Sequence, residues 1–551
     1  MRRIASWLLT LAVAASLVLP AAAAPASFSD VPTDSALAGE VQKAVDYGLM
    51  NGYSETTFGY SDTMTRAQFV TVVGRMLGWP QEAVNAPYIT PEMGIPQNLS
   101  AGYRTAINTA AEQDVLDTDK AFRPSAPITR AEMAEILTRA LGLKGAAAMA
   151  EQYISLPFID VTENAGYISI AYEIGMTKGT SSTTFAPNAT ATRAQAAAML
   201  VRIYEKLNQG LDWAHGFYAL SSYSQLDYAQ GMDAVSAGWS RMTWNGEEAL
   251  LATTSTSSNE FFIPSGYLSV TSYLESHDVD LNLSVYMDTS SGAAELLRSA
   301  DGREQAIEQI IHELTVDYNA LGTNPYDGVT IDFEGLRAAQ MEDFNSFLSA
   351  LAEKVHALEK SLYVCVSPVL VTGSYYNGYD YRTIGDVADK VILMAYDYDA
   401  KDLSAFVGTE YYKTAAPAPL DQVFLSLLAI TDEEFGAADH SKIVLGFSSK
   451  NTAWQIDGND KLVSGTPIYP DNETVYRRLQ QSDTSCGYSN TYQSNYATYT
   501  TETGERYFLW YDAVQPKLTA ARLLGVTGVS VWRLGTMPMY GSWNWTGLLH
   551  T

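Results

Sequence analysis

A four-residue motif occurs three times in the N-terminal part of the chain, and its even spacing limits the folds that this part can adopt. The copies are Thr65-Arg66-Ala67-Gln68, Thr129-Arg130-Ala131-Glu132 and Thr192-Arg193-Ala194-Gln195, so their arginines lie 64 and 63 residues apart. A phenylalanine precedes each arginine by eight residues: Phe58, Phe122 and Phe185. Such a period is the signature of a repeat architecture. We therefore expect three structural repeats, at residues 27–85, 86–150 and 151–207.

Each copy of the motif has the chemistry of a helix start. Threonine is a preferred N-cap residue, and a glutamine or glutamate three residues later completes a capping box. In the first copy, apolar residues then recur on one helical face: Phe69, Val70, Val73, Met76 and Leu77. We expect each repeat to hold a helix, a loop that carries the phenylalanine and a second, capped helix. One such unit cannot bury its apolar face alone, so the three should share a core as an all-α bundle.

These repeats resemble S-layer homology modules. The resemblance implies a three-fold bundle whose inter-repeat grooves bind an anionic, often pyruvylated, secondary cell-wall polysaccharide. The residues that it assigns to polymer binding are Arg66, Arg130, Arg193, Asp30 and Asp160. The two aspartates belong to the opening Phe-x-Asp motif, which the second repeat replaces with Tyr88-Ile-Thr90. The alternative for the arginines is a purely architectural role, or simple solubility at a helix start.

The first residues have the pattern of an export signal. Met1-Arg2-Arg3 supplies a positive charge, Ile4–Leu19 is almost entirely apolar, and the small residues Ala21–Ala26 offer a cleavage site. We expect a signal peptide at residues 1–26; an uncleaved membrane anchor is the alternative. No later segment has 18 consecutive apolar residues, so we expect no membrane span after cleavage. The expected location is the surface or wall of a bacterial cell.

Composition excludes one large class of partner. The chain has 34 Lys and Arg against 62 Asp and Glu, a formal net charge of −28. Because phosphate neutralisation needs surplus cations, nucleic-acid binding is not expected. The two cysteines, Cys365 and Cys486, can form at most one disulfide, and their positions give no strong reason to pair them.

From residue 212 to residue 551 the repeat disappears, and strand-length apolar runs alternate with amphipathic helices. The expected strands are Leu281–Met287, Val329–Phe333, Leu362–Val366, Val391–Ala395, Ile443–Phe447 and Val529–Trp532. Alternation over this length predicts an α/β domain with a parallel sheet, and its size suits a (β/α)₈ barrel. Residues 456–506, rich in Tyr, Thr and Ser, would form a late insertion in that barrel.

One of these strands carries a pair of carboxylates. With a period of two, Thr330, Asp332 and Glu334 point into the barrel, while Val329 and its alternating neighbours face the helices. Two buried carboxyl groups so close together tend to share a proton, which raises one pKa. A carboxylic acid with a raised pKa suits general acid catalysis at a glycosidic bond. The alternatives are an acidic strand edge in solvent and a metal site, although no His, Cys or third ligand is evident nearby.

The segment Tyr326–Glu334 resembles the signature strand of glycoside hydrolase family 18. Met394–Asp397 resembles the sixth-strand motif of that family and Gly528–Trp532 its eighth-strand end, in the right order across residues 212–549. The resemblance implies substrate-assisted, retaining hydrolysis without metal or cofactor. Its catalytic residues would be Glu334 as general acid and base, Asp332 holding the acetamido N–H, and Tyr396 donating to the acetamido oxygen. The substrate-binding set would be Asp327, Met394, Asp397 and Trp532.

This chemistry restricts the substrate to glycans with an N-acetyl group, chiefly peptidoglycan and chitin. Thr330 stands where many chitinases have Asp, and the third strand reads Leu283-Ser-Val-Tyr-Met-Asp288 in place of a Ser-x-Gly-Gly run. Both departures resemble the bacterial cell-wall and spore-cortex branch. We expect an envelope-anchored β-N-acetylglucosaminidase that acts on peptidoglycan. The alternatives are a chitinase or chitooligosaccharide hydrolase, a non-catalytic N-acetyl-glycan-binding protein, and a structural surface-layer protein.

Overall fold

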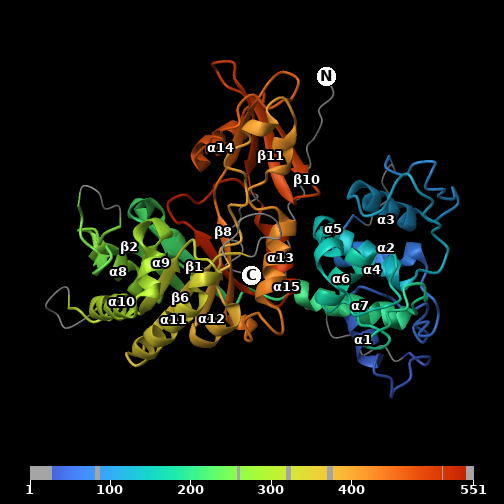
Figure 1. The fold of residues 1–551 in the computed structure, drawn as a ribbon. Coiled ribbons are helices and arrows are strands. Elements are labelled where there is room, and N and C mark those ends of the chain that lie inside the picture. The colour runs from blue at the N-terminus through green and yellow to red at the C-terminus, as the bar shows by residue number, and fades with distance from the viewer. Residues whose placement is uncertain are drawn as a thin grey trace. The chain divides into compact units, whose positions relative to one another are not determined.

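The computed structural model describes residues 28–80, 87–256, 261–317, 324–368, 377–511 and 513–541. They form two compact units, a helical unit up to residue 209 and a barrel unit from residue 210 (Figure 1). The expected signal peptide lies outside the described residues. No helix among the described residues combines the length and apolar character needed to cross a membrane.

The helical unit confirms the predicted three-repeat bundle. Its α-helices are α1 (Ala38–Asp46), α2 (Arg66–Met76), α3 (Ala101–Glu112), α4 (Arg130–Ala140), α5 (Lys144–Tyr153), α6 (Ala165–Glu173) and α7 (Arg193–Leu207). Thr65, Thr129 and Thr192 cap α2, α4 and α7, each in a complete capping box. The helix α5, which packs against α6, is an element that the repeat pattern did not predict.

The repeats close into a circle through their helices and their backbones. The first helix of each repeat packs on the second helix of the repeat before it: α3 on α2, α6 on α4, and α1 on α7. Before the capping threonines, Met64 N–H donates to Ala191 O (3.1 Å), Ile128 N–H to Met64 O (2.9 Å) and Ala191 N–H to Ile128 O (3.3 Å). This ring satisfies three buried backbone donors, so no single repeat is complete without the other two.

The barrel unit confirms the predicted (β/α)₈ architecture. Its eight parallel strands are β1 (Trp213–Tyr218), β2 (Ala234–Trp244), β4 (Asp280–Met287), β5 (Gly328–Phe333), β6 (Ser361–Val366), β7 (Lys390–Leu393), β8 (Ile443–Ser448) and β13 (Gly528–Trp532). Each strand pairs with the next, and β13 pairs with β1 to close the barrel. The short strand β3 (Ala249–Ala252) pairs antiparallel with β2 as a hairpin.

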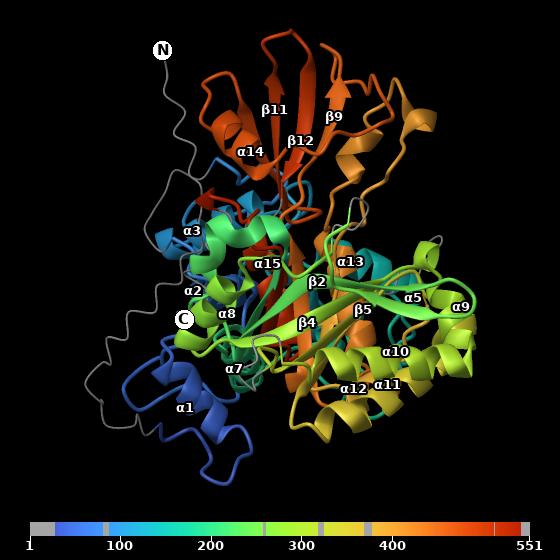
Figure 2. The same ribbon diagram turned by 90° about the vertical axis from the view of Figure 1, so that its left-hand side faces the viewer.

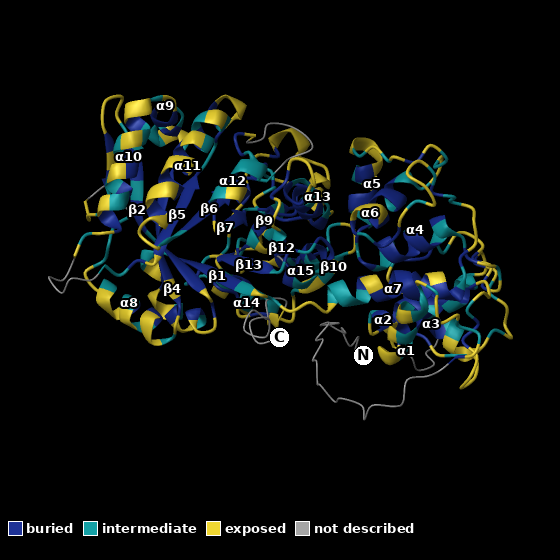
Figure 3. Ribbon diagram, turned by 90° about the horizontal axis from the view of Figure 1, so that it is seen from below, coloured by how far each residue is buried: buried dark blue, intermediate teal, exposed yellow. Residues whose placement is uncertain are grey.

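Helices cover the outside of the barrel. They are α8 (Tyr267–Ser276), α9 (Ala293–Arg298), α10 (Ala300–Glu313), α11 (Met341–His356), α12 (Tyr381–Val387), α13 (Leu420–Ile430) and α15 (Val514–Leu523). Figure 3 shows the strands as buried and α8, α10 and α11 as exposed along their outer faces. Apolar side chains fill the barrel interior: Phe217, Ala234, Tyr363, Cys365, Ile392 and Val444.

The predicted insertion is a small antiparallel sheet. Its strands β9 (Thr452–Ile456), β10 (Ser485–Ser489), β11 (Ser494–Thr500) and β12 (Arg506–Tyr511) are ordered β10-β11-β12-β9, and α14 (Asn472–Leu479) lies between β9 and β10 in the chain. The sheet projects from the barrel in Figure 2. Cys486 is exposed on β10 and Cys365 is buried on β6, and both thiols are free.

Candidate active site

The two carboxylates of the predicted pair lie at the carboxyl end of β5. This strand is buried along its whole length between β4 and β6. Thr330 and Asp332 are 0% and 4% exposed, while Glu334, which follows the strand, is only partly buried. The Glu334 N–H donates to the carbonyl oxygen of Met287 at the end of β4 (2.8 Å), which fixes the acid at the mouth of the barrel.

The environment of this pair favours the protonated form of both groups. Burial raises the pKa of Asp332 well above its usual range, and the Glu334 carboxylate raises it further. Burial likewise raises the pKa of Glu334, and the carboxylates of Asp288 and Asp397 add to the effect. Within the described residues, Asp332 Oδ1 is buried without a hydrogen-bond partner. Two close carboxyl groups that both resist ionisation behave as one coupled pair that holds a proton.

Asp288, directly after β4, is a third carboxylate at this end of the barrel that the sequence analysis did not assign to the site. It accepts hydrogen bonds from the Ser291 N–H (2.8 Å), the Ser290 hydroxyl (2.7 Å) and the Tyr286 hydroxyl (3.2 Å). Although burial alone would raise the pKa of Asp288, these hydrogen bonds lower it to about 2. A fixed negative charge near Glu334 favours the protonated acid. The sequence feature that could have identified Asp288 is its position directly after an apolar strand.

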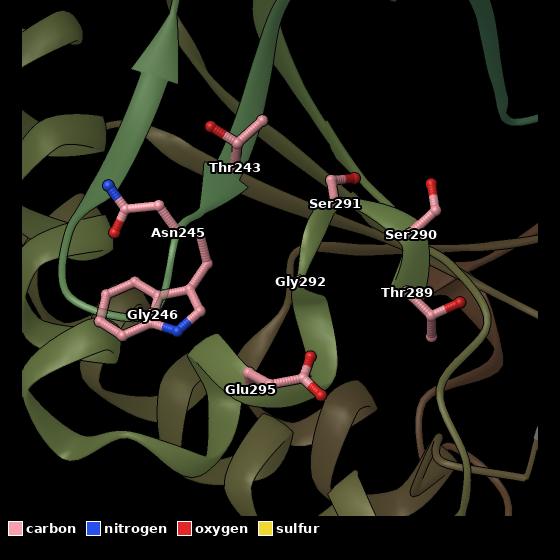
Figure 4. A pocket seen from close by; sticks show the side chains of 9 residues that line it. Thr243, Asn245, Gly246, Thr289, Ser290, Ser291, Gly292 and Glu295 are labelled. Carbon is pink, nitrogen blue, oxygen red and sulfur yellow. The ribbon is translucent and has the colours of Figure 1, made fainter.

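An open pocket of about 490 Å³ lies beside the Asp288 turn (Figure 4). The β2–β3 turn and the segment after β4 line it with Thr243, Trp244, Asn245, Gly246, Thr289, Ser290, Ser291, Gly292 and Glu295. Glu334 and Asp332 do not belong to this lining. The pocket therefore lies next to the carboxylates at this end of the barrel, joined to Asp288 by the two serines that bond to its side chain.

The segment after β7 brings three predicted residues to the same end of the barrel. Burial raises the pKa of Tyr396 well above its usual range, and the Asp332 carboxylate raises it further, so the hydroxyl remains a hydrogen-bond donor. Met394 packs, half-buried, against the apolar core of the barrel. Asp397 is exposed and adopts a left-handed backbone conformation with φ of 62°.

Two ion pairs tie this segment to the loop between β8 and β9. Lys450 Nζ lies 3.3 Å from Asp397 Oδ1 and 3.0 Å from Asp399 Oδ1. The Asp399 side chain is fully buried and accepts a further hydrogen bond from the Thr452 hydroxyl on β9 (3.1 Å). Lys450 was not predicted, because only the fold brings the end of β8 beside the end of β7.

Trp532 ends β13 at the barrel mouth and is 38% exposed. Its ring centroid lies 5.2 Å from that of the buried Phe217, which supports the indole from inside the barrel. A large aromatic surface held open at the mouth of a barrel suits stacking against the C–H groups of a sugar ring.

Thr330, which stands where many chitinases have Asp, belongs to a hydrogen-bonded chain of buried side chains. Its hydroxyl hydrogen-bonds to the Ser236 hydroxyl (2.6 Å), which contacts His215 Nε2 (2.7 Å), while His215 Nδ1 contacts the Ser530 hydroxyl (2.7 Å). Burial lowers the pKa of His215 to about 3, so the imidazole is neutral. The four side chains form an uncharged, fully buried chain across β5, β2, β1 and β13.

One predicted residue lies away from this centre. Asp327 precedes β5, at the opposite end of the strand from Glu334, and is exposed. Its Oδ2 accepts a hydrogen bond from the Leu281 N–H at the start of β4 (2.8 Å), and its own N–H donates to Leu281 O (2.7 Å). Asp327 therefore joins two strands at the closed end of the barrel, while Asp332, Glu334, Tyr396 and Trp532 gather at the open end.

The three arginines of the helical unit differ in their contacts. Arg193 is 6% exposed and donates to the carbonyls of Phe58 (3.0 Å) and Asn51 (2.7 Å) in the first repeat. Arg130 makes the same kind of contact with the Phe185 carbonyl (3.0 Å) in the third repeat. Arg66 instead forms an ion pair with Glu132. All three guanidinium groups thus contact a neighbouring repeat, two through backbone carbonyls and Arg66 through a carboxylate.

The two aspartates of the Phe-x-Asp motif also have partners inside the fold. Asp30 accepts hydrogen bonds from the backbone N–H groups of Phe58 (2.8 Å), Gly59 (2.7 Å) and Tyr60 (2.9 Å). Asp160 accepts the equivalent bonds in the third repeat, from Phe185 (2.8 Å) and Ala186 (2.7 Å). Each aspartate therefore shapes the loop whose carbonyl receives an arginine from the preceding repeat in the circle.

Comparisons with known proteins assign both units. Residues 271–536 match the family model of glycosyl hydrolases family 18, and residues 27–70, 98–134 and 157–197 match the S-layer homology domain. The chain is 24% identical over 258 residues to the cortical fragment-lytic enzyme of Bacillus subtilis (strain 168), covering 45% of this chain and 55% of that protein. It is 26% identical over 204 residues to an S-layer protein of Bacillus thuringiensis subsp. finitimus, covering 36% of this chain and 24% of that protein. The chain thus spans about half or less of the length of these relatives.

A solved structure supports the fold of the barrel unit. The C-terminal domain of a protein assigned as a chitinase from Desulfitobacterium hafniense DCB-2 superposes with a TM-score of 0.50 at 19% sequence identity. The match covers 62% of this chain and 99% of that domain. The residues gathered at the open end of the barrel, among them Glu334 and Trp532, all lie within the matched family 18 segment.

Proposed function

We propose that this chain, which carries a family 18 glycoside hydrolase domain and S-layer homology repeats, is a cell-surface glycosidase that cleaves N-acetylated glycans by substrate-assisted, retaining catalysis. The observation that carries the proposal is the pair Asp332 and Glu334 at the carboxyl end of β5. Asp332 Oδ1 has no hydrogen-bond partner within the described residues although it is buried. A buried carboxylate oxygen without a donor is costly, and an acetamido N–H would satisfy it.

Substrate binding sets the position of the shared proton. A hydrogen bond from the acetamido N–H stabilises the ionised form of Asp332, which lowers its pKa relative to that of Glu334. The proton then resides on Glu334, where the fixed charge of Asp288 also favours it. The bound complex therefore has an acid at the barrel mouth and an anion beneath the acetamido group.

The reaction follows from this arrangement. The acetamido oxygen attacks the anomeric carbon while the bond from that carbon to the leaving oxygen breaks, and Glu334 transfers its proton to the leaving oxygen. The product of this step is a cyclic oxazolinium ion, whose positive charge the Asp332 carboxylate stabilises. Water then attacks the anomeric carbon, Glu334 accepts its proton, and the ring opens with net retention.

The other residues hold the reacting groups in place. Tyr396, protonated and half-buried near Asp332, donates its hydroxyl to the acetamido oxygen and aims it at the anomeric carbon. Trp532 stacks beneath the sugar ring, while Asp397 and Met394 line the same subsite. We assign Asp327 a structural role at the closed end of the barrel, since its carboxylate is bonded to Leu281 there.

Peptidoglycan is the substrate that we favour. The relative named as a cortical fragment-lytic enzyme supports it, as does the placement of an N-acetyl-glycan hydrolase at the cell surface. Chitin oligomers are the second candidate, because the solved structure that superposes on the barrel is assigned as a chitinase. In the helical unit we propose that the inter-repeat grooves bind the anionic wall polysaccharide, with Arg66, Arg130 and Arg193 shaping or lining them.

The test compares both glycans with one active-site variant. Purified chain is incubated with peptidoglycan and with chitin oligomers, and new reducing ends are identified by mass spectrometry. We expect release from peptidoglycan, with loss of all release in Glu334→Gln and unchanged glycan binding. Glu342→Gln, an exposed glutamate on α11, is the matched control and should keep full activity. Binding of either glycan without cleavage by the unmodified chain would refute the proposed activity, and cleavage of chitin alone would refute the proposed substrate.

A further inference from the structure

Cys365 lies beside the catalytic pair, on the strand next to β5. β5 and β6 are parallel and in register, with Thr330 opposite Tyr363 and Ile331 opposite Val364. One step further along both strands brings Cys365 level with Asp332. Cys365 is 0% exposed and belongs to the apolar cluster inside the barrel, so its side chain points to the same interior as the carboxylate.

The titrations of the Cys365 thiol and the Asp332 carboxyl depend on each other. Burial and the Glu334 carboxylate raise the pKa of Asp332, and the hydrogen bond from Cys365 opposes them by lowering it. Burial, with the Asp332 and Glu334 carboxylates, raises the pKa of Cys365 well above its usual range, so the thiol keeps its proton and can only act as a donor. Thr330, the nearest side chain along β5, is engaged with Ser236 in the neutral chain.

We propose that Cys365 is a positioning residue of the active site, whose thiol donates a hydrogen bond to Asp332 and holds that carboxylate ionised beneath the acetamido group. The inference rests on the substrate-assisted mechanism proposed above and deepens it. An S–H group is a weak, uncharged donor. It stabilises the carboxylate without adding another negative charge to a site that already contains Asp332, Glu334 and Asp288.

The arrangement explains how Asp332 can pass its proton to Glu334 although position 330 holds a threonine and not a carboxylate. A carboxylate at position 330 would compete with Glu334 for the proton that Asp332 releases, because adjacent carboxyl groups share protons. Here the neutral Thr330 chain cannot hold that proton, since His215 is uncharged and its neighbours are hydroxyl groups. The remaining titratable groups that interact with Asp332 include Glu334 on its own strand and the tyrosines Tyr286, Tyr379 and Tyr396.

The experiment compares Cys365→Ser with Cys365→Ala in the full chain. Serine and alanine differ by one hydroxyl, so the pair separates hydrogen-bond donation from the filling of space. The Asp332 carboxyl is titrated by NMR in protein labelled with ¹³C at the aspartate side-chain carboxyl carbon, with Asp332→Asn used for assignment. The pH dependence of kcat and KM is measured on an N-acetylglucosamine oligomer. Cys486→Ser, the exposed cysteine of β10, is the matched control.

We expect the titration midpoint of Asp332 to lie about one pH unit higher in Cys365→Ala than in Cys365→Ser, which corresponds to one hydrogen bond to a charged group. The acidic limb of kcat should move in the same direction, with the unmodified chain between the two variants and Cys486→Ser unchanged. Coinciding midpoints in Ser and Ala variants would overturn the proposal and leave the thiol as a space-filling group. Circular dichroism checks folding, and if one variant fails to fold, the other is compared with the unmodified chain.

The NMR titration requires no turnover, which keeps two failures apart. If the unmodified chain cleaves no glycan but the midpoints differ as stated, the hydrogen bond stands and the proposed function is wrong. If the chain is active and the midpoints coincide, the function stands and the role of Cys365 is wrong.

Discussion

Removing the guanidinium group of Arg193 should loosen the first repeat, although the substitution lies in the third. The side chain is 6% exposed and its guanidinium carbon lies 4.3 Å from the ring centroid of Tyr53 and 4.9 Å from that of Phe58. It also donates to the carbonyls of Phe58 and Asn51. Arg193→Ala therefore removes contacts that join the two ends of the three-repeat circle.

The magnitude follows from these contacts. The Phe58 carbonyl lies in a buried part of the loop, and leaving it without a donor costs about 1–3 kcal/mol. Water can replace the donor at the exposed Asn51 carbonyl, so that bond contributes little. The two ring contacts of a largely desolvated guanidinium contribute about 1–2 kcal/mol. A total of about 3 kcal/mol corresponds to a roughly 100-fold higher opening frequency of the first repeat.

Hydrogen–deuterium exchange with mass spectrometry measures this change in the full chain. Peptides that contain Phe58–Tyr60 should exchange roughly 100-fold faster in Arg193→Ala. Arg202→Ala, an exposed arginine on the same helix, should leave their exchange unchanged. Unchanged exchange in Arg193→Ala together with lost binding to cell-wall sacculi would refute this reasoning and make the guanidinium a direct ligand of the polymer.

Three further outcomes follow from the barrel unit. Asp288→Asn removes a charge that raises the pKa of Glu334, so the alkaline limb of the pH profile of kcat should move to lower pH by up to about one unit; an unmoved limb contradicts the electrostatic role given to Asp288. A thiol reagent should modify Cys486 in the native chain and Cys365 only after unfolding, as peptide mapping will show; labelling of Cys365 in the native state contradicts its burial. Trp532→Ala should lower kcat/KM about tenfold on a soluble oligomer, whereas Trp532→Phe should keep most of it, and equal losses would argue against stacking.

Local patterns in the sequence predicted the parts of the molecule that local chemistry determines. The threonines Thr65, Thr129 and Thr192 were expected to cap helices, and each does so in a capping box. The alternation in Val329–Phe333 predicted a buried strand with inward-facing polar side chains, and the strand has that form. Such signals depend on a few neighbouring residues, so they can be read without knowing the fold.

The features that were missed depend on contacts between distant segments. Nothing near Arg193 in the sequence indicates that its guanidinium binds a carbonyl 135 residues away. Cys365 was considered only for a disulfide, because its position level with Asp332 depends on the register of β5 and β6. Lys450 meets Asp397 for a similar reason. Asp327 illustrates the converse, since it belongs to the same motif as Glu334 but lies at the other end of the strand.

The central claim is that the nucleophile belongs to the substrate, and the N-acetyl group tests it most directly. N-acetylglucosamine oligomers and the same oligomers after chemical removal of the acetyl groups are incubated with the full chain, and the products are identified by mass spectrometry. We expect cleavage of the acetylated oligomers alone, with none in Glu334→Gln. Comparable cleavage of the deacetylated oligomers would contradict the account, because a sugar without the acetamido oxygen cannot supply the attacking group.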